Sequence, residues 1–176
     1  MIEGGNPFLD PVERRDPARR FRGRLAAPVT LWTAGAPDEP AGLTMSSVTI
    51  AEGRPSSILG LVNPTTDLWD ALTSTGAFVV HVLGYEHRAL AERFAGQVPS
   101  PGGLWLELPV EHSEWGPRLA EVPNRACCRV QDSAEIGYAH LVIGKIEWLD
   151  VGEVDEPLIF FKGRYRRFAP RGAAGH

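Results

Sequence analysis

The sequence predicts a mainly β protein in which short strands close into a small barrel and only a few short helices are inserted. Two observations predict this fold class. Short apolar or alternating stretches recur between turn-rich segments along most of the 176 residues, and only two interior stretches have the apolar spacing of a helix. A regular alternation of strands and helices would instead indicate a parallel sheet with crossover helices. We therefore expect a barrel rather than a doubly wound α/β fold.

The expected strands differ in their patterns. Residues 29–33 are β-branched and aromatic, residues 43–50 alternate apolar and small polar side chains, and residues 58–62 form a short continuous apolar run. Alternation indicates a strand with one face in solvent, whereas a continuous run indicates a strand that is covered on both faces. The remaining strands are expected at residues 78–83, 125–130, 140–148 and 158–161.

Three helices are expected. Asp16 and Pro17 suit the cap and the first position of a helix that runs to about Leu25. Residues 67–75 and 86–95 each place their apolar side chains on one stripe, and each stretch is followed by a glycine that can end a helix.

The length suits one domain with a real core. We expect a loosely held N-terminal arm at residues 1–15, a single domain at residues 16–168 and a short C-terminal tail at residues 169–176. Within the domain, residues 97–122 are rich in Pro, Gly and Trp and are expected to form a long ordered excursion. Loops of this length are usually functional or lie at an interface.

Composition excludes several classes of protein. The net charge of −4 argues against nucleic acid or an anionic membrane surface as a partner, and no apolar run approaches the length of a membrane span. Cys127 and Cys128 are adjacent, so we expect free thiols, which suit a reducing cytoplasm. The first residues lack the basic and apolar regions of a signal peptide. We therefore expect a cytoplasmic protein.

Six arginines lie between Arg14 and Arg24, and Asp10, Glu13 and Asp16 belong to the same segment. Two interpretations of this segment remain open. It is either an anion-binding arm or a terminal helix with an ordinary solvated face.

Protein-based chemistry finds little support in the motifs. There is no dinucleotide-binding glycine fingerprint after a strand, no phosphate-binding Walker loop and no nucleophile elbow. The five histidines show no metal-ligand spacing, so no metal site is expected, and His81 inside an apolar strand is expected to be satisfied within the structure. A bound cofactor that supplies the chemistry is the better explanation.

Three segments suit a flat, anionic ligand that forms hydrogen bonds. Residues 41–47 place small hydroxyl side chains at a strand, which lets backbone amides approach a ring closely. Residues 63–67 form a polar turn between an expected strand and a helix N-terminus, where free amides and the helix dipole favour an anion. The simpler interpretation of that turn is that Thr66 or Asp67 only caps the helix. In residues 93–96, Phe94 either flanks the ligand or belongs to the core.

Taken in order, these segments resemble the flavin-reductase-like FMN-binding proteins of the split-barrel class. The resemblance covers roughly residues 16–168. Its markers are Pro28-Val29-Thr30, the stretch from Ala41 to Ser47, the Asn63-Pro64-Thr65-Thr66 turn, the stretch from Gly76 to Leu83, the stretch from Leu90 to Gly96, the stretch from His140 to Gly144, and the late Pro157-Leu158 with Gly163-Arg164-Tyr165-Arg166.

The resemblance implies a six-stranded antiparallel split barrel, a homodimer, and FMN, or in some cases FAD, bound near the subunit interface. It implies that NAD(P)H is the co-substrate and that His140 lies beside the flavin and the nicotinamide as the catalytic residue. Tyr165 is expected near the site in the closing strand. The other implied binding residues are Thr44, Met45, Ser46 and Ser47 for the isoalloxazine ring, and Asn63, Thr65 and Thr66 for the phosphate, with Phe94 nearby.

The chain departs from the family pattern at two positions. Ala139 stands where an acidic residue often precedes the histidine, and Val48 stands where an aromatic residue often follows the serine pair. The leading hypothesis is an NAD(P)H-dependent reductase that supplies reduced flavin to a monooxygenase or another acceptor. The alternative is an FMN-binding protein without nicotinamide-dependent turnover, such as a carrier, a sensor or a deazaflavin-linked protein. A third hypothesis is a barrel that binds no flavin.

Overall fold

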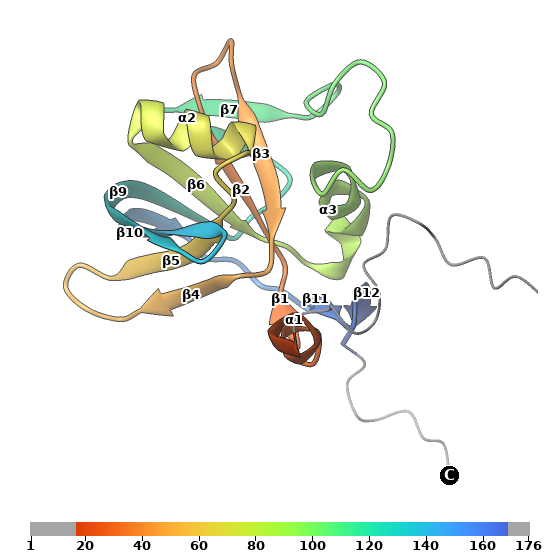
Figure 1. Ribbon diagram of the computed structural model, residues 1–176. Coiled ribbons are helices and arrows are strands. Elements are labelled where there is room, and N and C mark those ends of the chain that lie inside the picture. The colour runs from red at the N-terminus through yellow and green to blue at the C-terminus, as the bar shows by residue number, and fades with distance from the viewer. Residues whose placement is uncertain (1–16, 169–176) are drawn as a thin grey trace, which may run out of the picture.

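The computed structural model describes residues 17–168, so the expected N-terminal arm and C-terminal tail lie outside the described residues. Its main element is a curled, fully antiparallel sheet of seven strands in the order β3-β2-β6-β9-β10-β5-β4 (Figure 1). The strands are β2 (Thr30–Ala34), β3 (Ala41–Met45), β4 (Val48–Ala51), β5 (Ser57–Val62), β6 (Ala77–Val82), β9 (Arg125–Ile136) and β10 (Ala139–Asp150).

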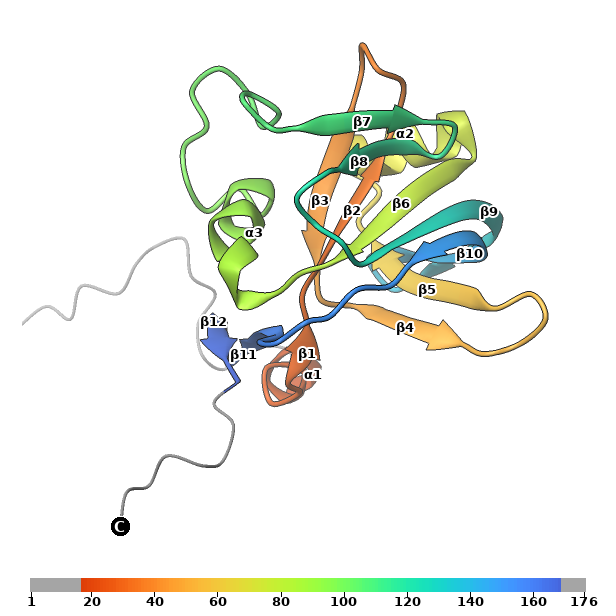
Figure 2. The same ribbon diagram turned by 180° about the vertical axis from the view of Figure 1, so that it is seen from behind.

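Shorter elements surround this sheet. A small sheet has the order β1-β11-β12, and a hairpin pairs β7 with β8 (Figure 2). Within residues 17–168 no helix is long and apolar enough to cross a membrane. The bounds are α1 (Pro17–Arg22), β1 (Ala27–Pro28), α2 (Asp67–Thr75), η2 (Tyr85–His87), α3 (Arg88–Phe94), β7 (Val110–Ser113), β8 (Gly116–Leu119), β11 (Leu158–Phe161) and β12 (Arg164–Arg167).

The mainly β fold is confirmed, and the structure corrects several details. The strand expected at residues 43–50 breaks at Ser46 and Ser47 into β3 and β4, so the sheet has seven strands rather than six. The excursion at residues 97–122 contains the β7–β8 hairpin, which its Pro- and Gly-rich composition did not indicate. The helix expected at residues 86–95 begins as the short 3₁₀ turn η2, and the first helix ends at Arg22.

The break at Ser46 and Ser47 explains why the sheet curls. β3 and β4 are the two edge strands of the sheet, yet only two residues separate them. Three residue steps span at most about 11 Å, so the two edges must approach each other at this point. The sheet therefore closes into a split barrel at a corner formed by Ser46 and Ser47, which we call the serine corner.

One core cluster fills the space between the curled sheet and α2. Trp32 and Phe78 stack in it with ring centroids 4.7 Å apart, and both are fully buried. Gly60 on β5 makes room for this pair, since a Cβ there would lie 2.6 Å from the Trp32 ring. A second cluster, which includes Leu31, Leu83, Phe94 and Leu158, packs around α3.

His81 is the buried polar residue that joins β6 to the excursion. Its Nε2 accepts from the Leu119 amide at 3.1 Å, so its Nδ1 carries the proton and donates to the Leu31 carbonyl, also at 3.1 Å. The side chain is fully buried, and this desolvation lowers the pKa of His81 from 6.5 to about 4. The expectation that His81 is satisfied within the structure is confirmed.

We predict that His81 makes the fold sensitive to acid. Because the folded pKa lies below the unfolded one, the unfolded chain binds the extra proton, and stability is lost as the pH falls from 6.5 to about 4. The expected loss is about 3 kcal/mol over this window. Urea unfolding at several pH values gives the free energy of unfolding as a function of pH. His81→Gln should lack the loss between pH 6.5 and about 4. The same pH dependence of the unfolding free energy in both proteins would contradict the prediction.

Candidate functional site

The serine corner is held by hydrogen bonds on both sides. The Thr30 hydroxyl donates to the Met45 carbonyl at 3.1 Å on the β3 side. On the β5 side, the Ser47 hydroxyl donates to the Leu61 carbonyl at 3.1 Å and the Leu61 amide donates to the Ser47 carbonyl at 3.2 Å. Within residues 17–168, the Ser46 and Ser47 amides donate to no protein acceptor. The corner therefore has two amide donors without a protein acceptor, on two exposed residues whose backbone is held in place.

A cavity of about 130 Å³ opens beside the corner. Two hydroxyls at this cavity converge on one carbonyl of α3, because Thr44 donates to the Ala91 oxygen at 2.9 Å and Tyr165 donates to it at 3.4 Å. Burial raises the pKa of Tyr165, so its phenol stays protonated and remains a donor. The cavity is lined by Val29, Thr44, Met45, Ser46, Ala95, Gln97, Phe160 and Tyr165.

Two of the predicted ligand residues have buried side chains. Met45 is 5% exposed and packs in the first core cluster. Phe94 is 2% exposed, contacts Trp105 edge-on at 5.0 Å, and covers Gly42 so closely that a Cβ there would lie 2.7 Å from its ring. The core interpretation of Phe94 therefore fits its environment, and the neighbouring Ala95 lines the cavity instead.

The polar turn is organised by Asn63. Its Oδ1 accepts from the Thr65 amide at 3.0 Å and from the Thr65 hydroxyl at 2.9 Å. Thr66 is the N-cap of α2: its hydroxyl donates to the Asn63 carbonyl at 2.7 Å and accepts from the Trp69 amide at 3.4 Å. The capping interpretation is thus confirmed for Thr66. The first amides of α2 remain directed at the turn, as at any helix start, so an anion site is compatible with the cap.

His140 lies next to this turn. It pairs with Val62 across β5 and β10, one residue before Asn63, and its ring stacks on Trp69 of α2 at 4.1 Å between centroids. Within the described chain the imidazole makes no hydrogen bond, so the stack is the contact that orients it. The sequence did not indicate Trp69 as a site residue. It lies beside the apolar stripe of α2, and no sequence pattern indicates which ring would contact His140 in place of the missing acidic residue at Ala139.

The predicted residues therefore form two groups on either side of the Ser47–Leu61 hydrogen bonds. The first group lines the cavity: Thr44, Met45, Ser46 and Tyr165. The second group lies at the end of β5 and the start of α2: Asn63, Thr65, Thr66 and His140. The second group does not line the cavity of the first. The serine corner joins them, since Ser47 bonds to β5 two residues before Asn63.

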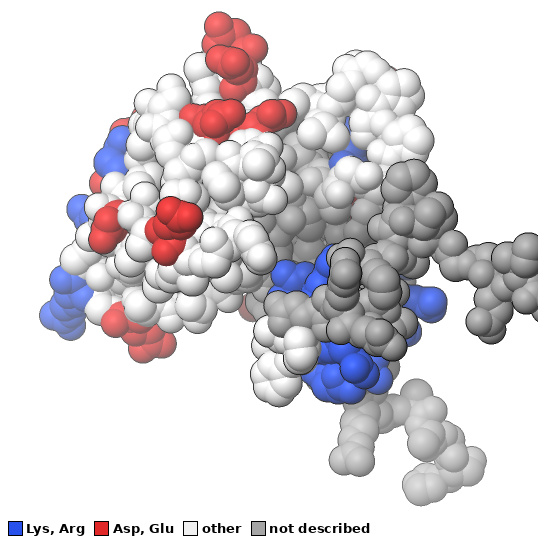
Figure 3. Space-filling view, viewed as in Figure 1, with Lys and Arg blue, Asp and Glu red and all other residues white. Residues whose placement is uncertain are grey.

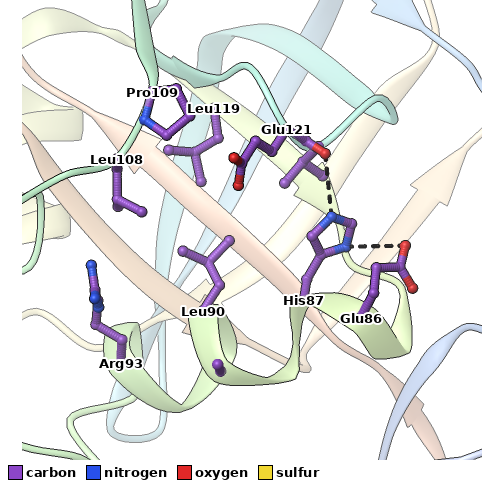
Figure 4. Close-up of a pocket in the computed structure, with 10 residues that line it drawn as sticks. Glu86, His87, Leu90, Arg93, Leu108, Pro109, Leu119 and Glu121 are labelled. Carbon is purple, nitrogen blue, oxygen red and sulfur yellow. Dashed lines mark hydrogen bonds and ion pairs between the residues drawn. The ribbon is translucent and has the colours of Figure 1, made fainter.

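Another cavity, of about 250 Å³, involves none of the predicted site residues (Figure 4). His87 accepts from the Gly84 amide through Nδ1 at 3.1 Å, which leaves Nε2 to donate to the Glu121 carbonyl at 3.3 Å. Arg93 donates to the Leu106 carbonyl at 3.2 Å. The polar side chains here thus connect η2 and α3 to the excursion. Within residues 17–168 no group of three or more His, Cys, Asp or Glu side chains is arranged to hold a metal.

Comparison with known proteins identifies the class. Residues 22–169 match the flavin reductase like domain family, and the chain belongs to this family. It is 30% identical over 163 residues to the reductase component of 4-nitrophenol 4-monooxygenase/4-nitrocatechol 2-monooxygenase of Rhodococcus opacus, covering 92% of this chain and 85% of the relative. It is 28% identical over 162 residues to the FMN reductase (NADH) RutF of Methylorubrum extorquens, covering 89% of this chain and 77% of the relative.

A solved structure agrees with this assignment. The NADH:FAD oxidoreductase SgcE6 of Streptomyces globisporus matches 92% of this chain and all of its own chain, with a TM-score of 0.79 and 27% identity. The family resemblance inferred from the sequence motifs is confirmed.

We predict that the Trp69–His140 stack contributes measurably to stability. Aromatic pairs of this kind are worth about 0.5–1.5 kcal/mol beyond area burial, so a double-mutant cycle of Trp69→Leu and His140→Ala should give a coupling energy in that range. Urea unfolding of the four proteins measures it. Trp69→Phe, which keeps an aromatic face, serves as the control and should retain most of the coupling. Additive single effects would show that the two rings do not interact.

Proposed function

We propose that this protein is an NAD(P)H:flavin oxidoreductase that reduces FMN, or FAD, and supplies the reduced flavin to a monooxygenase or another acceptor. The names of the relatives support this function, since they are an FMN reductase that uses NADH and the reductase component of a monooxygenase. The single structural observation that supports it best is the serine corner, because it joins a cavity with free amides to a polar turn at a helix start.

The residues at the corner fit a flavin by their chemistry. The Ser46 and Ser47 amides are free donors for the carbonyl side of the isoalloxazine ring, where negative charge grows on reduction. The first amides of α2, beside Asn63, Thr65 and Thr66, suit the phosphate. The two threonine hydroxyls must turn away from Asn63 to donate to it, and the nearby carboxylate of Asp67 must point away from it. When bound, the flavin supplies the hydride-accepting chemistry, so the protein needs no general base of its own.

His140 is proposed to orient the nicotinamide of the hydride donor. The missing acidic residue before it motivated the alternative of a flavin-binding protein without turnover. The stack on Trp69 gives the imidazole a fixed orientation without a carboxylate partner, and this observation favours the reductase. The two ring nitrogens are left available for a ligand.

We also propose that two copies of the chain form the complete site. Apolar side chains beside the second group of site residues are exposed: Leu61 next to the serine corner is 42% exposed, and Ile136, which pairs with Ala139, is 51% exposed. A second subunit that covers these side chains would remove them from water beside His140. The two free, buried thiols of Cys127 and Cys128 support a cytoplasmic location.

The decisive experiment is anaerobic absorbance spectroscopy of the purified protein with FMN. We expect NADH or NADPH to bleach the flavin band at catalytic protein concentrations, and air to restore it. The same protein without FMN, and FMN without protein, are the controls. Tight FMN binding without bleaching would favour the carrier alternative. A protein whose melting temperature does not rise with FMN would show that no flavin is bound.

The phosphate assignment is tested by comparing FMN with riboflavin. Thr65→Ala removes a hydroxyl from the turn and is expected to raise the Kd for FMN about fivefold, while the Kd for riboflavin, which has no phosphate, stays unchanged. Fluorescence titration measures both constants. Thr73→Ala is the matched control, because this exposed threonine lies on α2 away from the turn and its hydroxyl donates only to helix carbonyls, those of Trp69 and Asp70. An equal loss for FMN and riboflavin would place the phosphate elsewhere.

A further inference from the structure

The cavity beside the serine corner continues into an outer compartment. This compartment has a volume of about 300 Å³ and shares Gln97, Phe160 and Tyr165 with the inner cavity. The shared residues make the two cavities parts of one groove. The outer compartment is also lined by Arg88, Glu92, Gly163 and Arg164.

The charge of the outer compartment depends on Arg164. Glu92 is its acidic residue, and Arg88 forms an ion pair with that carboxylate at 2.8 Å, so these two charges offset each other. Arg164 is exposed, and no carboxylate of residues 17–168 lies within ion-pair distance of its guanidinium. The compartment therefore has a net positive charge at its β12 wall.

Arg164 belongs to a larger basic surface over α1 and the β11–β12 hairpin (Figure 3). Eight of the 18 lysines and arginines lie in residues 19–24 and 162–167. Among the described residues, Arg167 is the one of these eight that forms an ion pair, with Glu156 at 2.6 Å. The molecule as a whole has a net charge of −4. The basic surface therefore attracts an anion to the outer compartment, independently of the start of α2, where Asp67 and Asp70 lie.

The wall shared by the two compartments is aromatic. Phe160 and Tyr165 pack edge to face with ring centroids 5.4 Å apart, and both are partly exposed. An aromatic wall next to an unpaired guanidinium matches a ligand that has a base and phosphates.

We propose that the outer compartment binds the adenosine diphosphate moiety of a dinucleotide, with Arg164 contacting the diphosphate and the aromatic wall contacting the adenosine. The inference rests on the proposed function, because it assigns a compartment of the same groove to one part of a substrate. FMN lacks this moiety. NAD(P)H and FAD both contain it, and the experiment separates these two sources.

The first measurement is calorimetric binding of ADP itself to Arg164→Gln. Loss of a charge-assisted contact should weaken ADP about tenfold and leave the Kd for FMN within about twofold. Arg166→Gln is the matched control, because this arginine is an exposed neighbour on the same strand and does not line the compartment. Circular dichroism verifies that both variants are folded.

The second measurement identifies the source of the ADP moiety. If NADH occupies the compartment, Arg164→Gln raises the KM for NADH with FMN as acceptor and leaves kcat nearly unchanged. If FAD occupies it, the variant raises the Kd for FAD relative to FMN instead.

Three results would overturn the proposal: no ADP binding by the wild-type protein, equal losses in Arg164→Gln and Arg166→Gln, or no change in either the KM for NADH or the Kd for FAD. ADP binding is measured without turnover. A protein that fails to oxidise NAD(P)H would therefore contradict the proposed function, whereas the ADP titration judges the compartment separately.

Discussion

The chain passes from one edge of the seven-stranded sheet to the other in two residues, and the hydrogen bonds between Ser47 and Leu61 hold that passage in place. Strand pairing alone would leave β3 and β4 as open edges on opposite sides of a flat sheet. The short connection forces the edges together, so the sheet curls around Trp32 and Phe78. The same break in pairing frees the Ser46 and Ser47 amides. Closure of the barrel and exposure of the donors are thus two results of one constraint.

Packing around α3 and the β7–β8 hairpin fixes the α3 side of the cavity beside the serine corner. His81 bonds to the backbone of β2 and of β8, which fixes the hairpin of the excursion against the barrel. Phe94 fills the space above Gly42 and thereby fixes α3 against β3. Because α3 is fixed, the Ala91 carbonyl can accept from both Thr44 and Tyr165. Buried packing residues therefore set the width of the cavity.

Charge is distributed unevenly around the barrel. Arginines with few carboxylate partners gather at α1 and β12, while Asp67 and Asp70 lie in the first turn of α2. A helix start with two carboxylates is a weaker anion site than its dipole alone would give, since each carboxylate opposes part of that field. A phosphate therefore meets a different electrostatic environment at β12 than at the start of α2.

The sequence by itself determined the mainly β fold, because apolar alternation and turn residues report strand burial locally. It also determined the family, since motifs such as Asn63-Pro64-Thr65-Thr66 keep their order along the chain. The N-cap at Thr66 was predictable for the same local reason. The tertiary structure alone decided that the alternating stretch at residues 43–50 divides between two edges, because alternation does not report which partner a strand takes. It also decided that Trp69 faces His140 across 71 residues of sequence and that Arg164 lines the same groove as Ser46. Such contacts depend on strand register and on the curl of the sheet, which no local pattern contains.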